Sequence, residues 1–334
     1  YDKVSGSIVA AEGATYYLFS EASTGAQLTA DLQKLGAAAA ADTSGAHYSA
    51  YIIGEVTVSG DLTAPAKVEL FLGRERALTV IGKLTVESSA YVYATEALTV
   101  GSMEVKADSA VDAYGGIRYG STLTINGSMV LYDKSFGTGT TSTITIGAGG
   151  KLMNGYEAMT IADRWSVSAG ATVDNSGSLV VPVEHRGDLA GKKNVPGNIY
   201  SVKMLTDTEA SRPGALQSAM AAFDSVSGKA ENEYFNVVVR NAQLRQPLQF
   251  TLPEDLTVGG TVDGMSFLQL APPANTESFF PTVTLPAGKT LTVALGKQLS
   301  STVPFVVNGT LVLPDGGGMV DGTYPTATFN GGLQ

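Results

Sequence analysis

The feature that most constrains the fold of this chain is a short recurring pattern of an apolar residue, a threonine and a second apolar residue. A glycine usually follows within a few residues. In an extended strand alternate side chains point to opposite faces, so the two apolar residues share one face and threonine lies on the other. The pattern occurs at Leu78-Thr79-Val80, Leu98-Thr99-Val100, Leu123-Thr124-Ile125, Ile144-Thr145-Ile146, Met159-Thr160-Ile161, Leu256-Thr257-Val258 and Leu291-Thr292-Val293.

The spacing of these triplets indicates a repeat. The first four begin 20, 25 and 21 residues apart, and the next step is 15 residues. A unit of about twenty residues is too short to bury its own apolar face, so neighbouring units must stack, as in a solenoid. Leucine-rich repeats have this period, but their Leu and Asn consensus is missing, and a propeller blade needs about forty residues. Further strands are expected between the triplets, at Met103-Glu104-Val105, Met129-Val130-Leu131 and Ala171-Thr172-Val173.

A first segment that breaks the β pattern has the apolar spacing of an amphipathic helix. Leu28, Leu32 and Leu35 lie at i, i+4 and i+7, and Thr24 with Gln27 forms an expected capping box before them. We expect Gly36 to weaken the far end of this helix, because glycine is a poor helix former.

A second segment repeats this arrangement in the other half of the chain. Leu216, Met220 and Phe223 share one helical face, Ser211 is the expected N-cap and Pro213 the expected first-turn residue. A strong strand and a Leu-Thr-Val triplet follow each helix. We therefore predict a duplicated chain, with a first half at 1–184, a connection at 185–197 and a second half at 198–334, each half opened by a short helix.

Together the triplets and helices resemble the pectin-lyase-like superfamily of right-handed parallel β-helix proteins, in which a helix commonly covers the N-terminal end of the coil stack. They also resemble adhesin-like surface proteins of bacteria that share this fold. The resemblance implies a mostly β, right-handed parallel β-helix over most of the chain. A pair of β-sandwiches linked by helices is the alternative.

The composition narrows the classes of partner. Hydrophobic residues make up 44% of the chain and charged residues 16%, and the net charge is −10. Nucleic-acid binders concentrate Lys and Arg, and anionic lipids attract basic segments, so neither nucleic acid nor a membrane is an expected partner. No apolar stretch is long enough to cross a bilayer, so no membrane insertion is expected. The chain has no cysteine, which excludes disulfides, thiolate zinc sites and a cysteine nucleophile.

The composition also bears on where the protein acts. A cysteine-free chain rich in Thr, Ser, Gly and Ala is typical of bacterial surface proteins, so we expect an extracellular or cell-surface location. The chain opens at Tyr1 without a signal peptide, which we interpret as a mature or trimmed form. Residues 326–334 hold neither a charged tail nor a closing helix, and we expect the native chain to continue beyond Gln334.

Acidic residues provide the best catalytic candidates. Asp108 and Asp112 would share a face of one straight strand, and Arg118 follows them. Paired carboxylates can bind calcium or divide into acid and base, although solvated turn residues would show the same pattern. A second group comprises Glu157, Asp163 and Arg164 beside Trp165. His47 and His185 belong to no metal-ligand motif, and we expect no metal site and no cofactor.

Tyrosines provide the best binding candidates. Tyr93, Tyr114 and Tyr132 recur near the coil period, and residues one coil apart stack about 4.8 Å from each other. An exposed row of such rings would suit sugars, whereas the same rings could form a ladder that stabilises the coils. Other aromatic residues crowd into the same half at Tyr91, Tyr119, Tyr156 and Trp165.

Three functions remain open at this point. The first is a non-enzymatic, adhesin-like module that contacts a polysaccharide or a host or cell-surface component. The second is a carbohydrate-binding module that uses the tyrosines, and the third is a polysaccharide lyase or glycosidase on the same fold. The tripeptide Arg186-Gly187-Asp188 also matches an integrin-binding motif.

Overall fold

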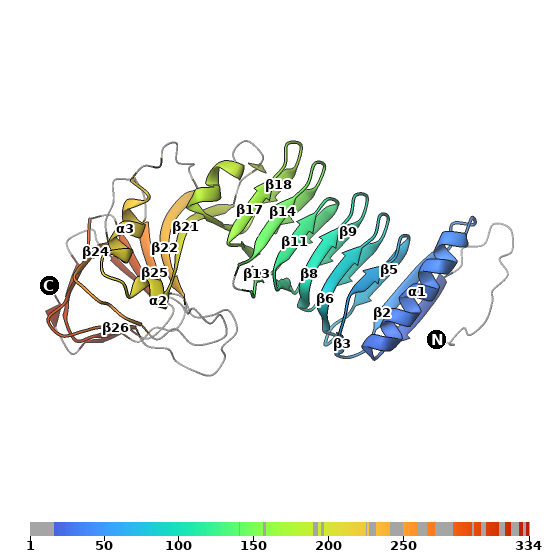
Figure 1. Ribbon diagram of the computed structural model, residues 1–334, viewed down its shortest axis with the longest axis horizontal. Coiled ribbons are helices and arrows are strands. Elements are labelled where there is room, and N and C mark those ends of the chain that lie inside the picture. The colour runs from blue at the N-terminus through green and yellow to red at the C-terminus, as the bar shows by residue number, and fades with distance from the viewer. Residues whose placement is uncertain are drawn as a thin grey trace. The chain divides into compact units, whose positions relative to one another are not determined.

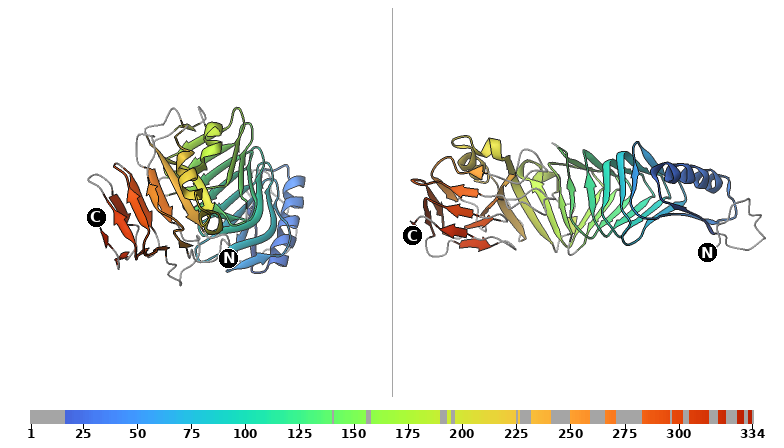
Figure 2. Two further views of the ribbon diagram at one scale, coloured as in Figure 1. Left: turned by 60° about the vertical axis from the view of Figure 1, so that its left-hand side comes forward. Right: turned by 90° about the horizontal axis from the view of Figure 1, so that it is seen from below.

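The computed structural model of the chain describes residues 17–139, 141–155, 158–189, 193–194, 197–224, 226, 232–240, 250–258, 266–270, 283–295, 297–301, 305–313, 318–321, 327–329 and 332–333. The chain divides into two compact units (Figures 1 and 2). Unit 1 comprises Tyr1–Leu179 and Gly187–Gly197, and unit 2 comprises Val180–Arg186 and Asn198–Gln334. Parallel strands stack as a solenoid in both units, which confirms the predicted fold class. The domain boundaries expected from the sequence remain a prediction.

Each complete coil of unit 1 passes through three strand positions. One position forms sheet A, whose strands pair in parallel from coil to coil. Its strands are β1 (Tyr17–Ala22), β2 (His47–Ile52), β5 (Val68–Leu72), β7 (Tyr91–Ala94), β9 (Ala110–Ala113), β12 (Ser128–Leu131), β15 (Lys151–Asn154), β18 (Thr172–Asn175) and β20 (Lys193–Asn194).

The other two positions of each coil lie in sheet B. In two coils a single long strand fills both positions, β6 (Leu78–Val86) and β8 (Leu98–Val105), and their pairing shifts register after Val80. In the remaining coils the first position is filled by β3 (Val56–Val58), β10 (Ile117–Tyr119), β13 (Ser135–Gly137) and β16 (Met159–Ile161). The second is filled by β4 (Leu62–Ala64), β11 (Thr122–Ile125), β14 (Thr143–Ile146) and β17 (Arg164–Val167).

This arrangement explains the irregular spacing of the triplets. Leu98 lies at the first position of sheet B and pairs with Leu78, whereas Leu123 lies at the second position and pairs with Met103. The 25-residue step therefore moves to another side of the coil. The 15-residue step does the same, because Ile144 pairs with Leu123 at the second position while Met159 opens β16 at the first. The triplets are thus not equivalent positions of one repeat.

The interior of unit 1 is filled by the apolar residues of these strands. The three residues of a typical triplet alternate as expected, with Leu123 and Ile125 fully buried and Thr124 turned outward. Two buried asparagines, Asn154 and Asn175, interrupt the stack of aliphatic side chains. The Nδ2 of Asn154 donates a hydrogen bond to the Oδ1 of Asn175 in the next coil at 2.8 Å. The same Nδ2 also donates to the carbonyl of Ser178 at 3.0 Å, which links consecutive coils by buried hydrogen bonds.

Helix α1 (Gly25–Ala41) packs against the first strands of unit 1, β1 to β5 (Figure 1). Its predicted face is confirmed, because Leu28, Leu32 and Leu35 are buried. Thr24 is the N-cap and accepts a hydrogen bond from the Gln27 backbone. Gly36 does not end the helix. A Cβ there would lie 2.6 Å from the Cβ of Pro65, so glycine lets the helix approach the coil closely.

Unit 2 also winds through three strand positions per coil. The first position is filled by β21 (Asn198–Thr206), β22 (Glu233–Arg240), β25 (Ser266–Leu270), β28 (Gln298–Ser301) and β31 (Gly318–Asp321). Sheet C contains β23 (Phe250–Thr251), β26 (Val283–Leu285), β29 (Phe305–Val307) and β32 (Ala327–Phe329). Sheet D contains β24 (Leu256–Val258), β27 (Thr290–Val293), β30 (Thr310–Val312) and β33 (Gly332–Leu333).

The helix expected in the second half is formed as α3 (Ala215–Ala221), and a further short helix that was not predicted, α2 (Asp207–Ala210), precedes it. Leu216, Met220 and Phe223 are buried as predicted. The predicted N-cap is wrong: Thr206 caps α2 through a capping box with Glu209, and Ser211 is the C-cap of that helix. Sequence spacing located the apolar face of α3 but not helix α2.

The predicted connection begins inside a 3₁₀ helix, η1 (Val183–Leu189), which follows β19 (Ser178–Pro182). Its Arg186 forms an ion pair with Glu233 of β22, with 2.5 Å from Nε to Oε1 and 2.7 Å from Nη2 to Oε2. Ser201 donates to the same carboxylate at 2.5 Å, and Glu233 is only 1% exposed. Because this contact buries a charge pair, Arg186 acts as a structural residue of unit 2.

Candidate functional site

The outer face of sheet A carries the most exposed aromatic side chains of the described residues. Along β2, β5 and β7, inward residues such as Ala50, Leu70 and Val92 are buried, and the residues between them face outward. Tyr51 pairs with Phe71, and Phe71 pairs with Tyr93, so these three rings form one column across three coils.

Two further tyrosines extend this column into an aromatic row, which comprises Tyr51, Phe71, Tyr93, Tyr114 and Tyr132. The consecutive ring centroids are 5.1, 6.1, 5.4 and 4.1 Å apart. Tyr93 pairs with Asp112 across the sheet, so Tyr114 is not in register with Tyr93. The row therefore steps diagonally by two residues between Tyr93 and Tyr114, and then continues to Tyr132.

The ring orientations differ along this row. Tyr51 stacks on Phe71 at an interplanar angle of 15°, and Tyr114 stacks on Tyr132 at 7°. In each of these two pairs one ring covers one face of the other, and this contact stabilises neighbouring coils. Tyr93 is tilted by more than 50° to both of its neighbours in the row, where the stacking is broken.

The tyrosines of the row remain open to a partner despite this stacking. Tyr51, Tyr114 and Tyr132 are 44%, 42% and 38% exposed. The hydroxyl of Tyr132 raises the pKa of Tyr114, so Tyr114 keeps its proton in any neutral solution. The row thus combines apolar rings with hydroxyl groups that donate and accept hydrogen bonds.

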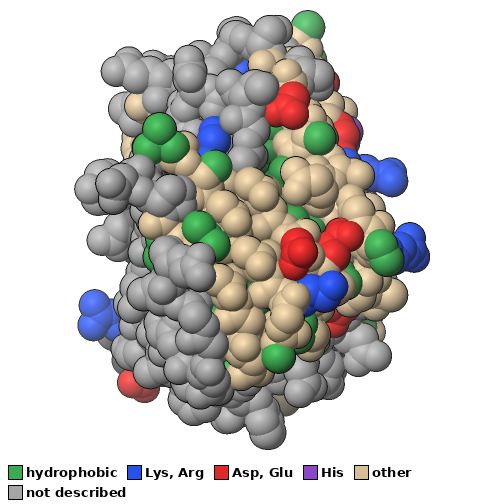
Figure 3. Space-filling view, turned by 90° about the vertical axis from the view of Figure 1, so that its left-hand side faces the viewer, with side chains coloured by type: hydrophobic (Ala, Val, Ile, Leu, Met, Phe, Trp, Pro, Cys, Tyr) green, Lys and Arg blue, Asp and Glu red, His purple; other side chains and the backbone are tan. Residues whose placement is uncertain are grey.

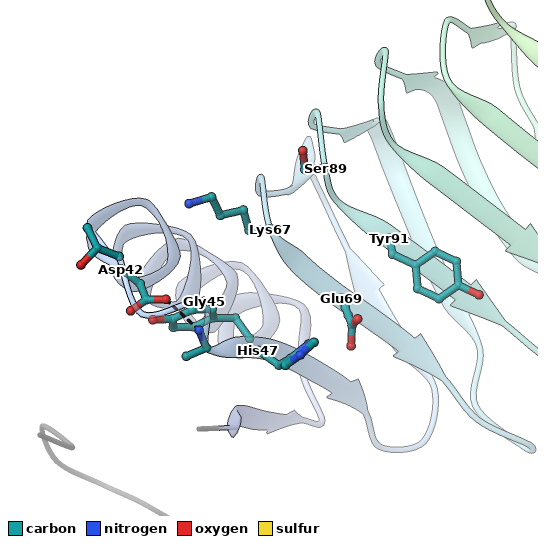
Figure 4. Close-up of a pocket in the computed structure, with 10 residues that line it drawn as sticks. Asp42, Gly45, His47, Lys67, Glu69, Ser89 and Tyr91 are labelled. Atoms are coloured by element: carbon teal, nitrogen blue, oxygen red, sulfur yellow. Dashed lines mark hydrogen bonds between the residues drawn. The ribbon is translucent and has the colours of Figure 1, made fainter. Parts of the chain in front are cut away.

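Next to the row lies a hollow of about 510 Å³, on the outer face of the same three strands (Figure 4). It is bordered by the loop after α1, the start of β2 and the turns before β5 and β7. The residues that line it are Asp42, Thr43, Gly45, Ala46, His47, Tyr48, Lys67, Glu69, Ser89 and Tyr91.

Tyr91 joins the hollow to the row. Its ring centroid lies 6.3 Å from that of Phe71 and 6.4 Å from that of Tyr93. Its hydroxyl donates to the Oδ2 of Asp112 at 2.8 Å. Burial and this hydrogen bond raise the pKa of Tyr91, so the phenol stays protonated and its orientation is held by Asp112.

The turns before β5, β7 and β9 share an unusual backbone. Lys67, Ser89 and Asp108 have φ values of 61°, 65° and 60°, in the left-handed region that favours glycine. The amide of Lys67 donates to the carbonyl of Ser89, and the amide of Ser89 to that of Asp108, at 3.2 and 3.0 Å. Two of these turns hold Lys67 and Ser89 at the rim of the hollow.

The structure does not bring the acidic candidates of the sequence together. Asp108 lies in the exposed turn before β9, whereas Asp112 lies on the outer face of β9 beside the aromatic row. Arg118 belongs to β10 in sheet B, on another side of the coil. Asp112 is therefore the one member of this group that adjoins the candidate site.

Most of the remaining candidates from the sequence are buried in the fold or bonded to neighbouring residues. Trp165 is 2% exposed and Tyr119 is fully buried, where its hydroxyl donates to the carbonyl of Ile161. Asp163 accepts two hydrogen bonds from Ser142, while Arg164 points outward from β17. Tyr156 and Glu157 lie outside the described residues. Arg186 of the integrin-like tripeptide is engaged by Glu233, which argues against that interpretation.

Several residues of the site were not singled out from the sequence, chiefly Tyr51, Phe71, Lys67 and Glu69. A signal for two of them was present, because Tyr51, Phe71 and Tyr93 follow one another at 20 and 22 residues. Lys67 and Glu69 carried no such signal, since the hollow depends on the loop after α1, which lies far from them in the sequence.

Within the described part of the chain, no group of three or more His, Cys, Asp or Glu residues is placed to hold a metal ion. No helix among these residues has the length and hydropathy needed to cross a membrane. On the face drawn in Figure 3, the hydrophobic side chains of the described residues form small separate areas among polar atoms. Comparison with known proteins returned no match to a family model, to a curated protein sequence or to a solved structure.

Proposed function

We propose that this chain is a non-enzymatic, adhesin-like module of the cell exterior that contacts a polysaccharide through the outer face of sheet A. The observation that carries this proposal is the aromatic row, in which Tyr51, Tyr114 and Tyr132 are each more than a third exposed. Large exposed tyrosines are typical of binding surfaces, because the ring is apolar and the hydroxyl stays wet.

The shape of the row supports a polymeric partner. It crosses five coils, so at a strand spacing of about 4.8 Å it is about 19 Å long. Exposed tyrosine side chains offer both apolar contact and hydrogen bonds along this length. A polysaccharide presents the complementary pattern of C–H groups and hydroxyls at regular intervals.

A lyase or glycosidase receives less support from the geometry. Such enzymes on this fold use clustered acids, or carboxylates with a basic residue, and Asp108, Asp112 and Arg118 lie on different parts of the coil. The negative charge of −10 and the Thr, Ser and Gly content support the proposed location outside the cell.

We also propose that the chain is a member of the pectin-lyase-like superfamily, with right-handed coils. The support is the coil with three strand positions and the helix packed on the first coils. An experimental structure tests this proposal, because coils that wind to the left would contradict it.

The binding proposal is tested with an array of neutral and acidic oligosaccharides. We expect the purified chain to bind a defined subset, and Tyr93→Ala/Tyr114→Ala/Tyr132→Ala to lose at least tenfold in affinity while keeping its circular dichroism spectrum. The matched control is Tyr200→Ala/Tyr234→Ala, which removes a stacked tyrosine pair of unit 2 with centroids 5.3 Å apart. Absence of binding to every glycan, or equal loss in both variants, would contradict the proposal.

A further inference from the structure

The hollow beside Tyr91 differs from the aromatic row in its chemistry. Its lining residues come from four segments of the chain, and the ring of Tyr91 points away from Lys67 (Figure 4). Asp42 comes from the end of α1, His47 and Glu69 from the outer faces of β2 and β5, and Lys67 from the turn before β5. The lining is therefore polar, and it carries charges of both signs.

The hydrogen bonds within the hollow show which groups are available to a ligand. Both oxygens of Asp42 are used, since Oδ1 accepts from the amide and hydroxyl of Ser44 and Oδ2 accepts from the amide of Ala46. Glu69 accepts one hydrogen bond from Ser49, at 3.2 Å to Oε2. Lys67 is exposed and forms no ion pair within the described part of the chain.

These groups match a neutral ligand with several hydroxyls. Lys67 can only donate, Glu69 can only accept, and Ser89 can do both. An anionic ligand would meet Lys67 but also the carboxylates of Asp42 and Glu69. A metal cation would find too few free oxygens. A sugar hydroxyl both donates and accepts, so a pyranose ring can satisfy the lysine, the carboxylate and the serine together.

We propose that the hollow is a binding subsite for a single neutral pyranose unit, with Lys67 and Glu69 as its hydrogen-bonding residues. A volume of about 510 Å³ lies within the range of small-molecule sites. This inference rests on the proposed function, because Tyr91 contacts both Phe71 and Tyr93 and so leads from the hollow to the row. The subsite receives the terminal unit of the polysaccharide that lies along the row.

Saturation-transfer NMR measures the binding of glucose, galactose, mannose and N-acetylglucosamine, and of glucuronate as the charged counterpart. We expect at least one neutral sugar to bind with a Kd of about 1 mM, as is usual for so small a ligand. Glu69→Gln and Lys67→Met should each weaken binding by about tenfold or more, because each removes a charge-assisted hydrogen bond. Asp174→Asn and Lys151→Met, on the outer faces of β18 and β15, are the matched controls and should bind as the unchanged protein does.

The outcomes separate this inference from the proposed function. The subsite is supported if Glu69→Gln and Lys67→Met lose sugar binding while the two controls keep it. In that case the same two variants should still bind the oligosaccharide array, with lower affinity. Unchanged sugar binding in Glu69→Gln and Lys67→Met, tighter binding of glucuronate, or no binding of any neutral sugar would overturn it. In those cases the proposed function would stand if binding to the oligosaccharide array still depends on Tyr114 and Tyr132. Absence of array binding would contradict both the proposed function and the subsite.

Discussion

Units 1 and 2 open in the same way but stabilise that opening by different means. In each, a strand leads through helix to a second strand that pairs with it in parallel, β1 with β2 and β21 with β22. In unit 1 the helix uses leucines and a close approach at Gly36. In unit 2 the helical segment supplies Phe223, whose ring centroid lies 5.5 Å from that of Phe235, and a buried ion pair lies beside it.

The two units therefore differ in which positions can change without loss of the fold. The stability of a coil stack is distributed over neighbouring coils that resemble one another, so unit 1 can carry a functional face on sheet A at little structural cost. In unit 2, part of the stability depends on the hydrogen-bonded ion pair of Arg186 and Glu233. Four experiments test this contrast, and they are given in order of decreasing effect on stability.

The largest effect is expected from breaking the ion pair of unit 2. Glu233→Gln removes the counter-charge of Arg186, whose side chain is 23% exposed while that of Glu233 is 1% exposed. Because Arg186 is only partly buried, we expect a loss of about 3 kcal/mol in the free energy of unfolding, at the low end for a buried ion pair. The control is Glu104→Gln, which breaks the exposed pair with Lys83 and should cost less than about 1 kcal/mol. Urea denaturation followed by circular dichroism measures both, and equal losses would show that the stability of unit 2 does not depend on this ion pair.

The next effect concerns the close approach of α1. Alanine normally stabilises a helix relative to glycine, but a Cβ at Gly36 would lie 2.7 Å from the Cγ of Pro65. We therefore expect Gly36→Ala to destabilise unit 1 by about 1–3 kcal/mol through overpacking. Ala40→Gly, at an exposed position of the same helix, should cost only about 1 kcal/mol through helix propensity. A more stable Gly36→Ala protein in thermal unfolding would show that α1 does not rest tightly on the coil.

A smaller effect is expected from the stacked tyrosines. Tyr114 and Tyr132 stack at 4.1 Å, and Tyr200 and Tyr234 at 5.3 Å. A double-mutant cycle to alanine should give a coupling energy of about 0.5–1.5 kcal/mol for Tyr114 and Tyr132. The same cycle on Tyr200 and Tyr234 compares the two units directly. A coupling near zero in unit 1 would mean that its tyrosines do not stabilise the coils.

The smallest effect concerns the loop after α1. Hydrogen bonds from Ser44 lower the pKa of Asp42. A carboxyl with a lowered pKa stabilises the fold above its unfolded value of about 3.9, and this contribution is lost as the pH falls through the lowered folded value. Asp42→Asn should therefore destabilise the protein slightly at neutral pH, and the difference should vanish in acid. A difference that is independent of pH, measured by urea denaturation across the acidic range, would contradict this.

The sequence predicted the features that depend on local pattern. Alternation in triplets such as Leu123-Thr124-Ile125 identified the buried face, and helical spacing identified Leu28, Leu32 and Leu35. The assignment of triplets to sides of the coil could not be predicted, because the same pattern serves both positions of sheet B. Helix α2 was not predicted, because the apolar spacing of Leu216, Met220 and Phe223 begins only after it.

The candidate site was predicted only in part. Tyr93, Tyr114 and Tyr132 were identified from their spacing, but the orientation of their rings depends on packing between coils. The hollow depends on three segments that are distant in the sequence, around Asp42, Lys67 and Ser89. The separation of Asp112 from Arg118 follows from the turn of the coil between β9 and β10, which strand periodicity alone does not reveal.

In the proposed function, sheet A of unit 1, and not unit 2, forms the contact surface. Acetylation of tyrosines with N-acetylimidazole, located by mass spectrometry, tests it directly with xylan, pectin and glucomannan as the added polysaccharides. We predict that at least one polymer protects Tyr51, Tyr114 and Tyr132 while Tyr200 and Tyr234 react as before. Protection of the unit 2 tyrosines instead, or no protection of the sheet A tyrosines by any polymer, would contradict the account.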